Sequence, residues 1–133
     1  MDNSKDISRW LLVTASFIIL IVLVGGLTRL TQSGLSIVEW NLVTGILPPL
    51  SEESWDIEFN KYKTSPEFQI INANISMSNF KTIYFWEYFH RLLARVVGLI
   101  AFIPLLYFII KKKIKKHEFR NFLIIPLLIL IQG

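Results

Sequence analysis

Three residues that can carry chemistry lie close together at the start of a long apolar stretch: the acid Glu87, His90 and Arg91. Ionisable side chains at membrane depth are costly, so each is expected to have a partner or a function. A neutral imidazole such as that of His90 is a standard axial ligand of haem iron, and a carboxylate such as that of Glu87 can accept or deliver protons. The guanidinium groups of Arg91 and Arg95 could bind the carboxylates of a porphyrin.

These residues share one face if the stretch is an α-helix. With about 100° per residue, His90 and Arg91 lie within about 60° of Glu87. The same face continues with three small residues, Ala94, Gly98 and Ala101. A bulky planar ligand could approach the backbone closely there, although small residues at this spacing are also typical of tight packing between membrane helices.

A purely structural interpretation of the charged residues stays open. Glu87 and Arg91 have the i, i+4 spacing of a helical ion pair, and Glu87 could also compensate a charge on His90. Zinc fits less well, because a closed zinc site needs four ligands and the chain offers one other histidine, His117, on the opposite side. The chain contains no cysteine, which excludes disulfides, thiolate ligands and thiol redox chemistry.

Composition and patterning predict an all-α integral membrane protein. Of the 133 residues 53% are apolar, and they are gathered in blocks. The net charge is +4, but the basic residues lie between the apolar blocks and do not form a basic face with interleaved aromatic residues. Membrane lipids are therefore the expected partner, and nucleic acid is not.

Two apolar blocks are long enough to cross a bilayer. The first, at residues 10–27, is uncharged and would measure roughly 27 Å as a helix, and the second covers residues 84–110. A third block at 121–133 predicts a partial span, and we expect the chain to be the N-terminal part of a longer membrane protein. The pair Gly25-Gly26 is expected to weaken the first helix as it leaves the membrane.

The charges of the two connecting segments predict the topology. Residues 111–120 hold six Lys or Arg and one acid, whereas residues 28–84 hold four Lys or Arg and six acids. The positive-inside rule makes 111–120 a cytoplasmic loop and 28–83 an external loop, with the N-terminus in the cytoplasm. The lysine cluster is then a topological anchor, although it could also bind anionic lipid.

The external loop begins with the hydroxyl-rich stretch TRLTQSGLS, which offers hydrogen-bond donors at the membrane edge. Its Arg29 could bind a ligand carboxylate, or it could neutralise the dipole at the helix end and reach out to water. Farther on, Ser51 followed by acids predicts the start of a short amphipathic helix. The aromatic stripe of that helix, Trp55, Phe59 and Tyr62, favours simple packing.

Two long segments carry a family resemblance. The first is VGGLTRLTQSGLSIVEWNLVTGILPPLSEESWDIEFNKYKTSPEF, and the second, farther along the chain, is WEYFHRLLARVVGLI. Together, at this separation, they resemble the haem A synthase family and are most similar to its alphaproteobacterial and mitochondrial branch. The resemblance covers nearly the whole chain.

This resemblance implies a fold and a reaction. Members of the family are eight-helix membrane enzymes built from two four-helix halves, so the chain would be the N-terminal part of the first half. They oxidise a methyl group of haem O to the formyl group of haem A, with water as the oxygen source, for the cofactor of cytochrome oxidase. A haem b cofactor is held in one half and the substrate haem in the other, which places the haem b site largely outside this chain.

The resemblance also implies roles for particular residues. His90 looks like the axial histidine of the N-terminal half, bound to the iron of haem O, and Glu87 looks like the carboxylate that takes part in methyl oxidation. From electrostatics we expect Arg91, Arg95 and Arg29 to bind haem propionates. The partner histidine, and both histidines of the second half, would lie beyond the last residue of the chain.

The expected setting is the bacterial inner membrane, or the mitochondrial inner membrane if the source is eukaryotic. Haem O and lipids are the expected partners, and haem O synthase and a second copy of the chain are candidates. The alternative function is a non-catalytic membrane haem b electron carrier. Such a carrier would not require Glu87, and its haem would change redox state with unaltered side chains.

Overall fold

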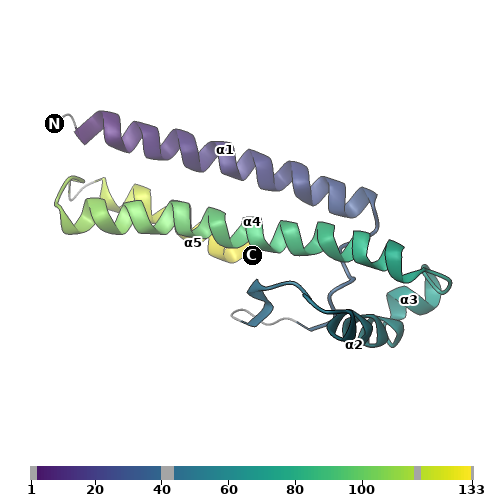
Figure 1. Ribbon diagram of the computed structural model, residues 1–133. Helices are drawn as coiled ribbons and strands as arrows, with labels where there is room; N and C mark the ends of the chain where they lie inside the picture. Colours follow the sequence, from purple (N-terminus) through teal and green to yellow (C-terminus); the bar gives the residue numbers. More distant parts are fainter. Residues whose placement is uncertain (1–2, 40–43, 116–117, 133) are drawn as a thin grey trace. The chain divides into compact units, whose positions relative to one another are not determined.

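The computed structural model describes residues 3–39, 44–115 and 118–132, and this part of the chain is helical with no strands. The elements are, in order, α1 (Asn3–Leu30), the 3-10 helix η1 (Thr44–Ile46), α2 (Glu52–Lys63), α3 (Pro66–Ile70), α4 (Met77–Ile110) and α5 (Phe119–Gln132) (Figure 1). Parts of the predicted external loop, cytoplasmic loop and partial span fall on residues 40–43, 116–117 and 133, outside the described residues, and so does His117.

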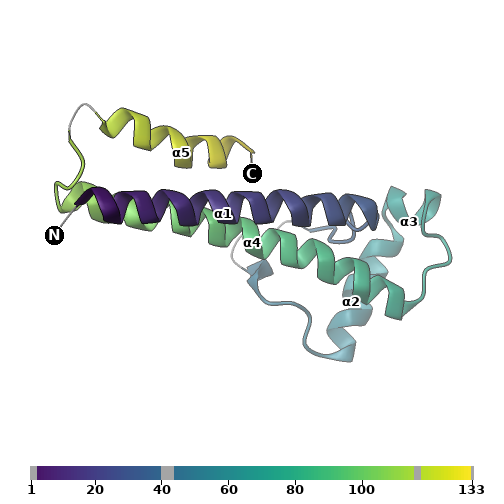
Figure 2. The same ribbon diagram turned by 90° about the horizontal axis from the view of Figure 1, so that it is seen from above.

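The chain divides into two compact units. The first consists of residues 1–22 and 93–133, and the second of residues 23–92. Within each unit a stretch of α1 lies beside a stretch of α4, as both views show (Figures 1 and 2). Each unit therefore contains parts that are distant in sequence.

Helices α1 and α4 are long and apolar enough to cross a membrane. At 1.5 Å per residue, the 34 residues of α4 measure about 51 Å, which exceeds the roughly 30 Å of bilayer hydrocarbon. The 14-residue α5 is apolar but shorter. The expected weakening at Gly25-Gly26 does not end α1, which continues to Leu30, because glycine lowers helix propensity without preventing the backbone hydrogen bonds.

Trp10 is the centre of packing in the first unit. It is 5% exposed, and its indole Nε1–H donates to the carbonyl of Ile100 over 2.9 Å. Its ring lies 5.7 Å from that of Phe108 on α4 and 5.9 Å from that of Phe122 on α5. One amphipathic aromatic residue thus joins all three helices of this unit.

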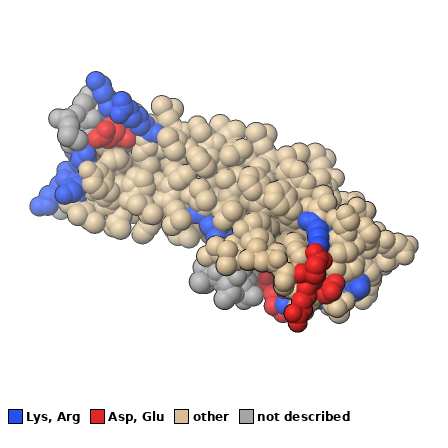
Figure 3. All heavy atoms as spheres, in the orientation of Figure 1, with Lys and Arg blue, Asp and Glu red and all other residues tan. Residues whose placement is uncertain are grey.

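An ion pair joins the beginning of α1 to the segment after α4. Lys113 Nζ lies 3.2 Å from Asp6 Oδ2, and this hydrogen bond raises the pKa of the lysine. Basic side chains gather at this end of the unit, where Figure 3 shows blue atoms around a small red group. The basic segment and the N-terminal end of the first span are therefore on the same side.

An aromatic cluster forms the core of the second unit. Phe59 and Tyr62 from α2 are buried against Phe80 and Tyr84 at the beginning of α4. Tyr62 stacks on Phe80 at 5.1 Å between ring centroids, and Trp55 lies 5.0 Å from Tyr84. The aromatic stripe of α2 is used for packing on the first turns of α4.

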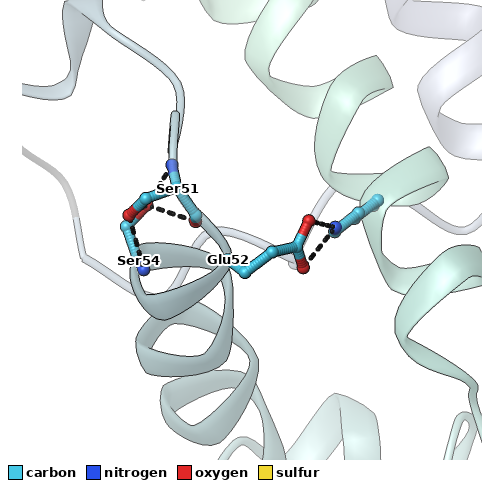
Figure 4. Close-up of polar contacts among 4 residues, drawn as sticks. Ser51, Glu52 and Ser54 are labelled. Atoms are coloured by element: carbon cyan, nitrogen blue, oxygen red, sulfur yellow. Dashed lines mark hydrogen bonds and ion pairs between the residues drawn. The ribbon is translucent and has the colours of Figure 1, made fainter.

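Local hydrogen bonds set the start of α2. The hydroxyl of Ser51 accepts from the amide of Ser54, while the hydroxyl of Ser54 accepts from the amide of Ser51, which is a reciprocal capping box (Figure 4). The first residue of the helix, Glu52, then pairs with Lys81 of α4 at 3.0 Å. Lys61, near the other end of α2, bonds to two glutamates, which raises the pKa of its amine.

Candidate functional site

Helix α4 places the predicted acid in the interior of the second unit. Glu87 is 3% exposed, and its Oε2 accepts hydrogen bonds from the Ser36 hydroxyl at 2.7 Å and from the Ile37 amide at 2.8 Å. A buried carboxylate is costly unless its oxygens are hydrogen-bonded, and these donors come from the segment that follows α1.

Arg91 satisfies the other carboxylate oxygen. Its Nε lies 3.0 Å from Glu87 Oε1, and its Nη2 donates to the same oxygen. Nη2 also lies 3.4 Å from the carbonyl of Ile37. The i, i+4 spacing of Glu87 and Arg91 allowed a helical ion pair, and the pair is present. Arg91 also ties it to the segment that follows α1.

The turn after α1 is shaped by its hydroxyl residues. The Ser33 hydroxyl donates to the carbonyl of Thr28 at 3.1 Å, and the Ser33 amide donates to the same carbonyl at 2.9 Å. Gln32 has a φ of 50°, a left-handed conformation that reverses the chain. Three hydroxyl residues of this segment, Thr28, Ser33 and Ser36, are buried. The turn brings Ser36 and the Ile37 amide to Glu87.

His90 lies one helical turn after Glu87 and faces α1. A Cβ atom built at Gly25 would lie 3.1 Å from Nε2 of the His90 imidazole, 3.6 Å from Cδ2 and 3.9 Å from Cε1. The Nε2 edge of the ring is thus against the backbone of α1 at a position without a side chain.

The other residues predicted for the site differ from Glu87 in their exposure or in the compact unit to which they belong. Arg29 is exposed in the last turn of α1, where it also suits the helix dipole. Arg95 is half-buried on α4 and belongs to the first unit. Of the small residues, Ala101 is buried, whereas a Cβ at Gly98 would meet nothing within 4 Å.

Sequence reasoning missed Ser36, the Ile37 amide and Gly25 as parts of this site. The sequence signal for Ser36 and the adjacent Ile37 amide was the hydroxyl-rich stretch at residues 28–36, and both groups donate to Glu87. For Gly25 the sequence offered only its residue type. We interpreted that glycine as a weakening of the first helix and not as part of the site.

Comparison with known proteins gives a family match over most of the chain. Residues 8–133 match the family described as cytochrome oxidase assembly protein. The chain belongs to this family. A Heme A synthase of Ehrlichia canis (strain Jake) is 56% identical over 136 residues, which cover 99% of this chain and 39% of that protein. No solved structure matches the chain.

Other members of the family give the same picture. A Heme A synthase of Orientia tsutsugamushi (strain Boryong) is 52% identical over 98% of this chain, and one of Rickettsia bellii is 49% identical over 97% of it. These matches cover 36% and 38% of the relatives' lengths. The chain therefore spans about two fifths of the length of these curated relatives.

Proposed function

We propose that the protein to which this chain contributes is a haem A synthase, which oxidises the methyl group of haem O to the formyl group of haem A with oxygen from water. The observation that carries the proposal is the 49–56% identity of nearly the whole chain to relatives named Heme A synthase. The buried acid and the histidine on adjacent turns of α4 supply suitable chemistry.

The donor set of the described residues suits haem iron better than a bare metal ion. Among residues 3–39, 44–115 and 118–132 no three His, Cys, Asp or Glu side chains gather where they could hold a metal. A closed zinc site needs four protein ligands, whereas haem iron would need only one or two from the protein. In this proposal His90 holds the iron of the substrate haem, and the haem b cofactor binds largely outside this chain.

Glu87 is proposed to move protons during methyl oxidation. Conversion of a methyl group and one water to a formyl group releases four protons and four electrons, so a base near the reacting carbon is needed. Ser36, the Ile37 amide and Arg91 fix the position of this carboxylate. Positioning of an acid-base group is a large part of its efficiency.

The arginines are proposed to bind haem propionates, as Arg91, Arg95 and Arg29 can each present a planar pair of donors. Arg91 differs from the other two because its Nε and Nη2 already bond to Glu87. Its proposed role therefore includes holding the acid.

The proposed setting is the inner membrane of a bacterium, with the N-terminus in the cytoplasm. The pair of Asp6 with Lys113 supports two crossings between the N-terminal end and the basic segment, and the positive-inside rule places that side in the cytoplasm. The relatives from Ehrlichia, Orientia and Rickettsia favour a bacterial source over a mitochondrial one. Haem O synthase and a second copy of the chain remain candidate partners.

The test uses the full-length protein with single substitutions. We expect Glu87→Gln to retain haem and to lose haem A formation, and His90→Ala to lose haem from the N-terminal half. Extraction and chromatography of the pigments measure both results. Glu53→Gln, at an exposed acid of α2, is the matched control and should form haem A normally. Normal amounts of haem A from the Glu87→Gln enzyme would refute the proposed role of Glu87, whereas a parent protein that binds haem but forms no haem A would favour the electron carrier.

A further inference from the structure

Gly25 of α1 lies beside the candidate ligand His90. A Cβ atom there would be 3.1 Å from His90 Nε2 and within 4 Å of the two carbon atoms bonded to that nitrogen. At the next residue, Gly26, a Cβ atom would meet nothing within 4 Å. Of these two adjacent glycines, only Gly25 has the imidazole of His90 in the space that a side chain would occupy.

We propose that Gly25 is a positioning residue for His90, and that its lack of a side chain leaves the space that lets the imidazole take the orientation from which it would bind haem iron. This inference rests on the proposed function, in which His90 is the iron ligand. It adds a residue from α1 to a site otherwise built on α4 and the turn after α1.

The contact distance gives the physical reason. A separation of 3.1 Å between a methyl carbon and a ring nitrogen is shorter than ordinary van der Waals contact, so one of the two groups must move. Because the methyl group would be fixed to a helical backbone, the imidazole would have to shift by a few tenths of an ångström from its present orientation. Mutation of groups that orient a metal ligand typically lowers metal affinity about 10–100-fold.

The glycine pair is not needed to end the helix. α1 continues from Gly25 through Gly26 to Leu30, and alanine favours a helix more than glycine does. If backbone propensity alone mattered, Gly25→Ala and Gly26→Ala would have the same effect. A difference between them therefore isolates the contact with the imidazole.

The experiment compares these two variants in the full-length protein. Bound haem is measured by its pyridine haemochrome, and the iron ligation by the Soret band and the electron paramagnetic resonance spectrum. We expect Gly26→Ala to match the parent protein, and Gly25→Ala to bind haem about tenfold more weakly with altered spectra. Equal haem affinity and identical spectra in the two variants would overturn the inference.

Two further variants separate this inference from the proposed function. If His90→Ala leaves the haem spectrum unchanged, the proposed ligand is wrong. If it removes the contribution of the N-terminal haem while Gly25→Ala has no effect, only the role of Gly25 is wrong. Gly25→Ala is also added to His90→Ala, with yield and thermal stability as readouts. No further loss in that background supports action through the imidazole, whereas the same loss in both backgrounds shows a packing role and overturns the inference.

Discussion

The hydroxyl of Ser36 donates a hydrogen bond to Oε2 of Glu87 over 2.7 Å, although 51 positions separate the two residues. Both are buried, with 2% and 3% of their surface exposed. The Ile37 amide reaches the same oxygen at 2.8 Å. The turn after α1 therefore forms one side of the acid's environment, and the two sequence segments that carry the family resemblance meet at this carboxylate.

Substitution of Ser36 by alanine should destabilise the second unit. It removes one donor from a buried carboxylate, and a hydrogen bond to a charged group contributes about 1.5–3 kcal/mol. The free energy of unfolding of the full-length protein in detergent should fall by about that amount. Haem A formation should also decrease, because the carboxylate loses part of its support.

Ser16→Ala is the matched control for that substitution. The Ser16 hydroxyl also donates a hydrogen bond, to the carbonyl of Leu12 at 2.9 Å, but it is exposed and its acceptor is an uncharged carbonyl of its own helix. We expect a change within about 0.5 kcal/mol. Equal losses of stability in the two variants would show that the bond to Glu87 has no special importance.

Substitution of Arg91 by lysine should be costly although the charge is kept. The guanidinium uses Nε and Nη2 on Glu87 Oε1 and also reaches the carbonyl of Ile37, and a single ammonium cannot reproduce this fork. Loss of one good hydrogen bond to a charged group predicts a fall of about 1.5–3 kcal/mol in the free energy of unfolding.

The control for the arginine prediction is Arg29→Lys. Arg29 is exposed in the last turn of α1, so lysine can replace its interaction with the helix dipole. Chemical denaturation in detergent should give the same unfolding free energy for this variant as for the parent protein. A stable Arg91→Lys protein would indicate that the ion pair with Glu87 is dispensable.

The sequence predicts best those features that depend on residues close together in the chain. The two long apolar helices follow from uninterrupted hydrophobic runs, and the common face of Glu87, His90 and Arg91 follows from helical geometry alone. Each of these depends on residues that are near one another in the chain. No tertiary information was required.

The contacts that complete the site could not be predicted in the same way. Ser36 reaches Glu87 only because Ser33 and Gln32 reverse the chain after α1, and neither residue type determines such a turn. The position of Gly25 against His90 depends on how the end of α1 packs against α4. Contacts of this kind depend on packing between distant segments, which hydrophobic pattern and propensity do not specify.

Substitution of Phe80 by alanine should disrupt the aromatic cluster of the second unit. Phe80 is fully buried, and its ring lies 4.9 Å from that of Phe59 and 5.1 Å from that of Tyr62. Truncation of a buried phenylalanine costs about 3–5 kcal/mol. Limited proteolysis should therefore cut the segment between α2 and α4 much faster than in the parent protein.

Phe85→Ala provides the comparison on the same helix. Phe85 is 56% exposed, so its truncation removes little buried surface from this unit. The proteolysis rate of the segment should remain that of the parent protein. If both alanine variants were cut at the same rate, the aromatic cluster would not be what holds α2 against α4.

The buried phenol of Tyr62 predicts a specific loss of stability at high pH. Burial raises its pKa above the ordinary value of 10.0, although the hydrogen bond from Asn72 acts in the opposite direction. The folded state therefore holds this proton more tightly than the unfolded state. The corresponding stability is fully present below about pH 10 and is lost as the pH rises through the folded-state pKa.

Tyr62→Phe tests this linkage. Phenylalanine has no proton to lose, so the melting temperature of the variant should fall less than that of the parent protein between pH 8 and about pH 11. At pH 8 the variant should be less stable by about 1 kcal/mol, because the Asn72 amide loses its acceptor. Parallel melting curves for Tyr62→Phe and the parent protein across this pH range would contradict the linkage, since the phenol would then ionise equally in both states.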